Sequence, residues 1–419
     1  MYCQLDNLRR CMPSSIRKAL DELPVTLDDT YERILQNIPK QKWQHAHRLF
    51  QCMVVARRPF RVDELAEMFA IGFGPNSAPN LVEEWRPENA EEAVFSACST
   101  LITIIDSDSD SDSDSDVESY AEGSKIVQFS HFSVEEYLTS DRLQTSDAAN
   151  IRQFYISLEP AHTIMAWVCL AVLLQLEKNA DKERLATFPL ALYAARNWVD
   201  HAKFENVASQ VQDAMEDLFD PSKPHFLEWV RIHNVDDFHS DFDRIEKEGI
   251  PTRLFFVALC GFSSLAKHLI ITHALDVNAK VHFDWTPLFA ASRRGHVDVA
   301  QMLLDYGADV NAPDNYNQMP LFWASGEGND PKFMQLLLER GANVNVQTNH
   351  TKRTPLHEAS EYGQLEEVRL LLDHGADVQI RDEDGYTPYQ LATYWKHHDI
   401  AQLLLNCGAE REVEVEVEE

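Results

Sequence analysis

The sequence has few glycines, 14 in 419 residues, and none of them is followed by lysine. The chain therefore has no Gly-x-x-x-x-Gly-Lys-Ser/Thr loop of the kind that cradles phosphates in nucleotide-binding proteins. Gly326 and Gly328 begin a Gly-x-Gly-x-x-Gly pattern, but Pro331 stands where its third glycine would be. We therefore expect no nucleotide site, no cofactor and no enzymatic activity in this chain.

Cysteines and long apolar runs are equally scarce. The seven cysteines are scattered and form no Cys-x-x-Cys pair, so we expect reduced thiols and no zinc site. His357-Glu358 begins a zinc-protease motif, but residue 361 is glutamate and not the second histidine. The longest apolar run, Ile164 to Leu174, is too short to span a bilayer, and no secretory signal is visible. These absences predict a cytoplasmic or nuclear protein that does not insert into membranes.

Positive charge is in short supply overall, with 37 Lys and Arg against 68 Asp and Glu and a net charge of −31. Such a balance argues against general affinity for nucleic acid or anionic membranes. Residues 1–61 have the opposite bias, with eleven basic residues against six acidic ones. DNA binding by this N-terminal part is therefore a minor alternative.

One phrase recurs in the last third of the chain. It begins at Thr286, Met319, Thr354 and Thr387, with spacings of 33, 35 and 33 residues. Each copy continues with Pro and an apolar residue, and a leucine-rich run ending in Gly-Ala follows. This pattern resembles the ankyrin repeat in period and in letters. The resemblance implies pairs of helices that stack on one another, because a single unit cannot bury its own apolar face.

The repeated letters of the phrase have physical roles. Thr can cap a first helix that Pro begins, and Gly295, Gly328 and Gly363 fall at the tight link between the two helices. A degenerate copy beginning at Thr252 lacks the proline and the glycine that would end its second helix. We therefore predict five repeats over residues 251–409, a mainly α fold and an acidic, disordered tail over 410–419.

The N-terminal segments resemble a second family. Residues 3–11, 16–24 and 27–35 are similar to the end of the NACHT module in fungal NACHT–ankyrin proteins, which are signalling NTPases that act as switchable receptors. The resemblance implies that residues 1–40 are the C-terminal end of such a module. It also implies a nucleotide-binding core upstream of this point in the family.

A winged helix is predicted for residues 41–139. Residues 43–56 and 60–69 have helical patterns, and the β-rich runs 101–105 and 125–129 could pair as a hairpin. Residues 129–138 resemble the closing motif of this module, and similar winged helices follow the NTPase core in nephrocystin-like and GPI-inositol-deacylase-like families. His131 in this motif could serve in catalysis, but a half-buried imidazole bonded to backbone is the favoured interpretation.

The two β-rich runs are separated by an insert, 106–124, in which Asp and Ser alternate. Such a composition cannot build a core and predicts disorder. Loose calcium binding is one interpretation, but the glycine and the final glutamate of an EF-hand loop are missing. Phosphorylation is favoured, because each serine of the tract has an acidic residue three positions later; these are Ser107, Ser109, Ser111, Ser113 and Ser115.

Residues 140–250 have helical patterns throughout and resemble the bridging segment of the fungal proteins. Residues 162–176 predict a buried helix, and 188–202 and 207–219 predict two amphipathic ones. Such a segment could cover the open apolar end of the first repeat. Trp198 and His201 are interpreted as core and helix-end residues.

Protein binding is predicted to use the inner helices and the hairpin fingers of the repeats. Large aromatics and arginine dominate interface energetics, and packing between neighbouring repeats is the alternative for each aromatic. The candidates are Trp285, Arg293, Arg294, Tyr316, Arg353, Glu361, Tyr362, Tyr386, Tyr394 and Trp395. The predicted function is that of a non-enzymatic adaptor. The alternative is the sensing half of a NACHT-type NTPase, whose core would lie upstream or be supplied in trans.

Overall fold

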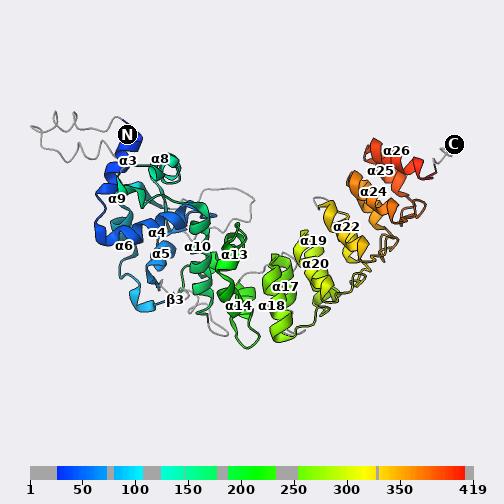
Figure 1. Cartoon of the computed structure of the whole chain (residues 1–419), viewed down its shortest axis with the longest axis horizontal. Helices are drawn as coiled ribbons and strands as arrows, with labels where there is room; N and C mark the ends of the chain where they lie inside the picture. Colours follow the sequence, from blue (N-terminus) through cyan, green and yellow to red (C-terminus); the bar gives the residue numbers. More distant parts are fainter. Residues whose placement is uncertain are drawn as a thin grey trace, which may run out of the picture. The chain divides into compact units, whose positions relative to one another are not determined.

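A computed structural model describes residues 26–72, 80–106, 124–146, 148–176, 187–232, 253–326 and 330–410. The chain divides into two compact units, residues 1–238 and 239–419 (Figure 1). Several predictions fall outside the described residues: most of the predicted NACHT-end segment 1–40, the five candidate phosphoserines, the link glycine Gly328 and nearly all of the acidic tail.

The first unit contains a small antiparallel sheet. Strand β5 (Lys125–Phe129) lies between β1 (Phe60–Arg61) and β4 (Ile102–Asp106). The β4–β5 register runs from Ile102 opposite Phe129 to Asp106 opposite Lys125, which confirms the predicted hairpin. The same unit contains helices α4 (Trp43–Val54), α5 (Val62–Glu67) and α6 (Ala90–Cys98). The winged-helix assignment stays a prediction.

The helix predicted over residues 60–69 is shorter than expected, and its first two residues are a strand. Phe60 and Arg61 pair with β5, so helix α5 begins only at Val62. The Glu64 carboxylate accepts a hydrogen bond from the Arg61 backbone N–H at 2.8 Å and two more from the Arg58 guanidinium at 2.7 and 2.8 Å. The buried carboxylate therefore fixes the point where the strand changes into the helix.

The rest of the first unit is helical. Helix α10 (Leu158–Leu173) is buried along most of its length and packs against α4 and α12 (Ala191–Ala202). Trp198 of α12 is fully buried against Trp229 of α15 (His225–Ile232), with ring centroids 5.4 Å apart. The helix predicted over 207–219 is interrupted at Val211, which separates α13 (Val207–Gln210) from α14 (Gln212–Phe219).

Shorter elements complete the described part of this unit: α3 (Leu27–Gln36), η2 (Lys40–Lys42), η3 (Met68–Ala70), β2 (Ile71–Gly72), β3 (Asn80–Leu81), η4 (Glu83–Trp85), η5 (Ser99–Leu101), α7 (Phe132–Leu138), α8 (Asp141–Gln144) and α9 (Ala149–Arg152).

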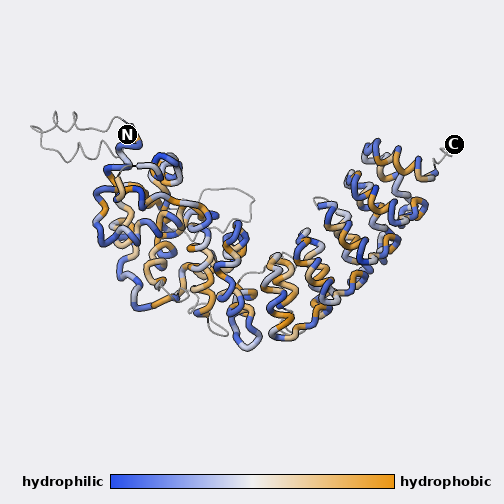
Figure 2. The backbone as a smooth tube through the Cα atoms, viewed as in Figure 1, coloured by the Kyte–Doolittle hydropathy of each residue, from blue (hydrophilic) through white to orange (hydrophobic). Residues whose placement is uncertain are grey.

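The second unit is a stack of helix pairs. Its inner helices are α17 (Arg253–Cys260), α19 (Pro287–Arg294), α21 (Pro320–Ala324), α23 (Pro355–Glu361) and α25 (Pro388–Tyr394). Their partners are α18 (Ser263–His273), α20 (Val297–Asp305), α22 (Pro331–Glu339), α24 (Leu365–Asp373) and α26 (His398–Asn406), and the turn η6 (His282–Asp284) precedes α19. Apolar segments recur along the stack (Figure 2), and Leu288, Leu321 and Leu356 are buried at the same position of successive phrases.

The starts of four of these inner helices follow the predicted phrase. Proline is the first residue of α19, α21, α23 and α25. The Thr286 hydroxyl accepts a hydrogen bond from the Phe289 N–H at 3.3 Å, and the Thr387 hydroxyl accepts one from the Gln390 N–H at 3.4 Å. Met319 replaces threonine before α21 and gives no such cap. The repeated letters therefore specify helix starts.

A ladder of asparagine side chains joins successive repeats. The Asn311 side-chain N–H donates to the Gly341 carbonyl at 3.1 Å, and its side-chain oxygen accepts from the Asn343 backbone N–H at 2.8 Å. Asn278 and Asn345 make the same pair of bonds to the repeats that follow them. We call this set the asparagine ladder. It satisfies the carbonyls that follow each outer helix.

Glycine at the link between two helices permits close contact with the next repeat. Gly363 has φ = +75°, and a methyl group there would come within 2.6 Å of the His397 ring. His397 Nε2 in turn lies 2.9 Å from the Glu361 carbonyl oxygen. Gly261 and His296 repeat this contact at the start of the stack. The predicted crowding at this link is therefore present at Gly363.

Candidate functional site

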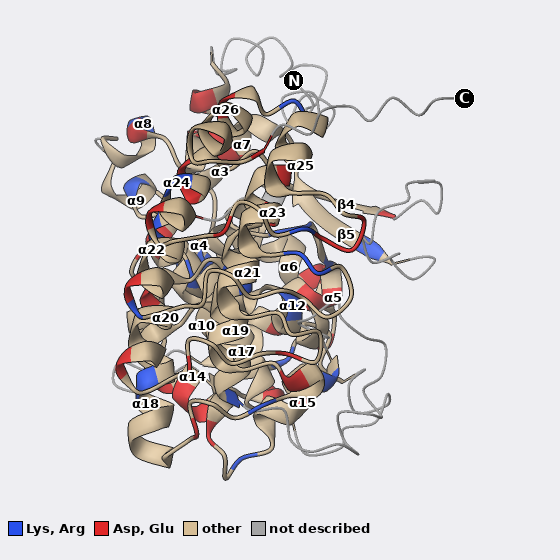
Figure 3. Ribbon diagram, turned by 90° about the vertical axis from the view of Figure 1, so that its right-hand side faces the viewer, with Lys and Arg blue, Asp and Glu red and all other residues tan. Residues whose placement is uncertain are grey.

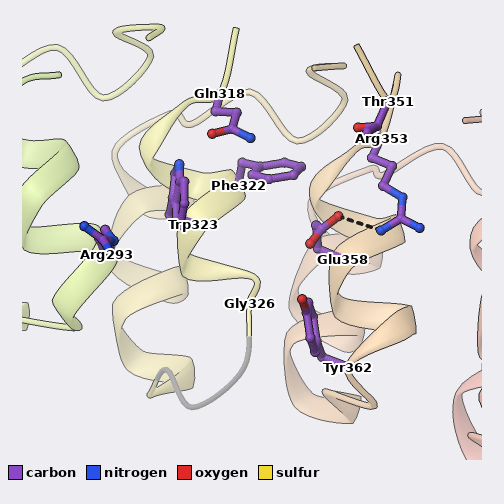
Figure 4. A pocket seen from close by; sticks show the side chains of 9 residues that line it. All are labelled: Arg293, Gln318, Phe322, Trp323, Gly326, Thr351, Arg353, Glu358 and Tyr362. Carbon is purple, nitrogen blue, oxygen red and sulfur yellow. Dashed lines mark hydrogen bonds and ion pairs between the residues drawn. The ribbon is translucent and has the colours of Figure 1, made fainter. Parts of the chain in front are cut away.

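A groove of about 490 Å³ opens between α21 and α23 in the second unit (Figure 4). Phe322 and Trp323 form its wall on α21, and Glu358 and Tyr362 form the wall on α23. The other lining residues are Arg293, Gln318, Gly326, Thr351 and Arg353. Tyr362 follows α23 directly and keeps helical backbone angles, so its side chain lies on the same face as that of Glu358, four residues earlier.

The α21 wall of the groove is held by aromatic packing. The Trp323 ring packs edge-on against Phe289 of α19, with centroids 5.4 Å apart. The Arg293 guanidinium lies over the Trp323 ring at 5.8 Å from its centroid. A cation at this distance is attracted by the negative face of the ring. The position of Trp323 is therefore fixed by the repeat before it.

The upper end of the groove contains one arginine among three carboxylates. Arg353 lies 2.5 Å from Glu361, 3.3 Å from Glu358 and 3.7 Å from Asp382. Burial raises the pKa of Glu358, and the Arg353 charge opposes this rise. Asp382 is buried and also accepts a hydrogen bond from the Tyr386 backbone N–H at 2.8 Å. We call Arg353 and these three residues the Arg353 cluster.

The exposed aromatics among the predicted binding residues lie beyond this groove as well as in it. The side chains of Tyr362, Tyr394 and Trp395 are 46%, 72% and 50% exposed, and the Tyr394 and Trp395 rings pack edge to face at 5.4 Å. Tyr316 and Tyr386 are exposed beside the hairpin fingers. Arg294 is exposed and Arg293 is half-buried. Five of the six predicted aromatics are therefore accessible to solvent.

Trp285 differs from the other aromatics because it is buried. Its ring stacks on Phe289 with centroids 5.0 Å apart, and its indole N–H donates to Asp314 at 3.4 Å. This environment favours the packing alternative for Trp285, whereas binding by the other aromatics stays a prediction.

The sequence prediction missed Phe322, Trp323, Glu358, Gln318 and Thr351. Trp323 and Glu358 occupy the same place, four residues after the start of the phrase, where Ala290 lies in the preceding repeat. A large or charged residue at a position that is small elsewhere in the array was the available signal.

The histidines that resemble catalytic residues have structural partners. His131 is exposed and not half-buried as predicted; its Nδ1 accepts from the Ser133 backbone N–H at 3.2 Å and caps α7. His357 is buried, and its Nε2 lies 3.1 Å from the Tyr386 carbonyl of the next repeat. His201 is buried in hydrogen-bond contact with His162 and Tyr193, as a core residue would be.

Comparison with known proteins supports the repeat assignment. Residues 254–348 and 327–415 match the family model for ankyrin repeats in three copies. The second unit contains ankyrin repeats. A curated relative, the azaphilone pigments biosynthesis cluster protein L of Monascus ruber, is 33% identical over 302 residues. That alignment covers 68% of this chain and 60% of the length of the relative.

The described residues also bear on membrane insertion and on metal binding. Among them, no helix has the length and apolar character needed to cross a membrane. Within the same part of the chain, no group of three or more His, Cys, Asp or Glu residues is arranged to hold a metal ion.

Proposed function

We propose that this chain is a non-enzymatic adaptor that captures a partner protein through the inner helices and fingers of its ankyrin repeats. The observation that carries the proposal is the set of exposed aromatics at the ends of α23 and α25, Tyr362, Tyr394 and Trp395. Burying such rings against a partner removes a large apolar area from water. The stack of repeats presents them on a regular helical frame, so little ordering of backbone opposes binding.

The experiment is photo-crosslinking with the full chain in the cells that make it. A benzoylphenylalanine at position 395 should trap one or a few partner proteins. The matched control is the same probe at Tyr306, an exposed aromatic that follows outer helix α20. Identical adducts from both positions, or none from position 395, would contradict the proposal.

The relative's name places that protein in an azaphilone pigment biosynthesis cluster. We further propose that the partner of this chain is a protein of a biosynthetic pathway of that kind. Mass spectrometry of the adduct at position 395 identifies the partner and tests the extension.

A second proposal is that this chain is the sensing and regulatory half of a NACHT-type signalling NTPase. The order α4, β1, α5, α6, β4, β5 with its antiparallel sheet supports the winged-helix part of this assignment. The test is the transcript upstream of Met1: a phosphate-binding loop in frame favours this proposal, and a stop codon directly before Met1 argues for the adaptor.

A further inference from the structure

The Arg353 cluster has more negative than positive charge. One guanidinium faces the three carboxylates of Glu358, Glu361 and Asp382, at distances from 2.5 to 3.7 Å. Glu361 makes the shortest contact, and Glu358 alone of the three carboxylates lines the groove. The groove therefore has an incompletely compensated carboxylate in its wall.

The groove also has aromatic surfaces that suit a planar cation. Tyr362, at the C-terminal end of α23, lies one turn below Glu358, and Phe322 and Trp323 face them from α21 (Figure 4). Arg293 already lies over Trp323, which shows that this surface accepts a guanidinium. A second guanidinium could contact Tyr362 with its face and Glu358 with its N–H groups, a combination that lysine reproduces only in part.

The charge of the repeats as a whole favours the same type of ligand. Residues 253–410 contain twelve Lys and Arg against twenty Asp and Glu. Acidic residues recur on the outer helices α20, α22 and α24, as Figure 3 shows in red. A partner with basic side chains would be attracted over several ångströms before it makes contact.

We propose that the groove between α21 and α23 binds an extended peptide segment of the partner that inserts an arginine side chain between Glu358 and Tyr362. This inference rests on the proposed adaptor function and names the chemistry of its partner. The arginine forms a charge-assisted hydrogen bond with Glu358, and the flanking residues of the peptide pack on Phe322 and Trp323.

The test uses the full chain and labelled heptapeptide pools with a fixed central Arg, Lys, Leu or Glu and randomised flanking residues. Fluorescence anisotropy should show tightest binding for the Arg pool. Glu358→Gln should weaken binding of that pool at least about tenfold, because a charge-assisted hydrogen bond is lost. The matched control is Glu366→Gln on outer helix α24, where the carboxylate is exposed; it should change the affinity less than twofold.

Tyr362→Ala provides a second variant, because its exposed side chain can be removed without opening the core. It should weaken the Arg pool more than the Leu pool. Equal affinity for the four pools, or an Arg preference that persists in Glu358→Gln, would overturn the inference. If the probe at position 395 still traps a partner in that case, the adaptor proposal stands and only the chemistry assigned to the groove is wrong.

Discussion

At the scale of single residues, asparagine side chains form hydrogen bonds between neighbouring repeats. Asn311 satisfies a backbone carbonyl of one neighbour, at Gly341, and a backbone N–H at Asn343. Neither bond is visible in the repeat letters, because Asn278, Asn311 and Asn345 resemble ordinary polar finger residues. Their role depends on the position of the next repeat, which the sequence does not state.

Asn311→Ala should lower the free energy of unfolding by about 1–2 kcal/mol, since it removes two hydrogen bonds and leaves a carbonyl and an N–H to water. Denaturant titration monitored by circular dichroism measures this loss. Gln335→Ala is the control, because the exposed Gln335 side chain donates to Glu339 on its own helix, α22, and not to a neighbouring repeat. An equal loss in both variants would contradict the role of the asparagine ladder.

Gly363→Ala should destabilise the protein by more than Gly375→Ala, although both glycines have positive φ. The added methyl at 363 meets the His397 ring, whereas nothing lies within 4 Å of a methyl at 375. The strained backbone costs both variants about 1 kcal/mol. The difference between their unfolding free energies therefore measures the clash alone, and a difference of zero would show that His397 moves away without cost.

At the scale of whole elements, His357 connects α23 to the finger before α25. It accepts a hydrogen bond at Nδ1 from the Thr354 N–H, and Nε2 lies 3.1 Å from the Tyr386 carbonyl. This pattern requires the neutral ring, with the proton on Nε2. Burial lowers the pKa of His357 to about 4, despite the favourable contact of its proton with the carbonyl.

Because the pKa of His357 is lower in the folded protein than in the unfolded chain, the free energy of unfolding depends on pH. In the unfolded chain the histidine binds a proton below pH about 6.5, whereas the folded protein resists protonation until about pH 4. The contribution of His357 to the free energy of unfolding is therefore fully present above pH 6.5. It falls as the pH drops from about 6.5 to about 4, by up to about 1.4 kcal/mol per pH unit. His357→Gln should flatten this fall in pH-dependent denaturant titrations; an unchanged slope would assign the fall to other groups.

Element boundaries were predictable only where local signals determine them. The proline-started helices of the repeats follow from sequence, as does the β4–β5 hairpin. The helical pattern of residues 60–69 includes Phe60 and Arg61, but both residues pair with β5. Local sequence could not reveal this pairing, because β5 is more than 60 residues away in the chain. The groove could not be predicted for the same reason. Trp323 and Glu358 belong to different repeats, and only the stacking of the two repeats brings these side chains to opposite walls.

At the scale of the molecule, variants of the exposed aromatics can test partner binding without disturbing the fold. Tyr362→Ala combined with Trp395→Ala should leave helical circular dichroism and the unfolding midpoint nearly unchanged, because both rings are about half exposed. The same double variant should weaken partner capture about tenfold or more in a pull-down with the identified partner. Loss of helical signal would instead show that both rings belong to the core.

The asparagine ladder has a consequence for how such a chain can change in length. Every step is a side-chain amide that donates to the carbonyl of a glycine in the next repeat, from Asn278 and Gly307 through to Gln379 and Gly408. Duplicating or deleting one whole unit would therefore leave a matching junction on both sides of the cut. Gene variants that differ by multiples of roughly 33 codons should still yield folded products, whereas cuts out of this phase should not.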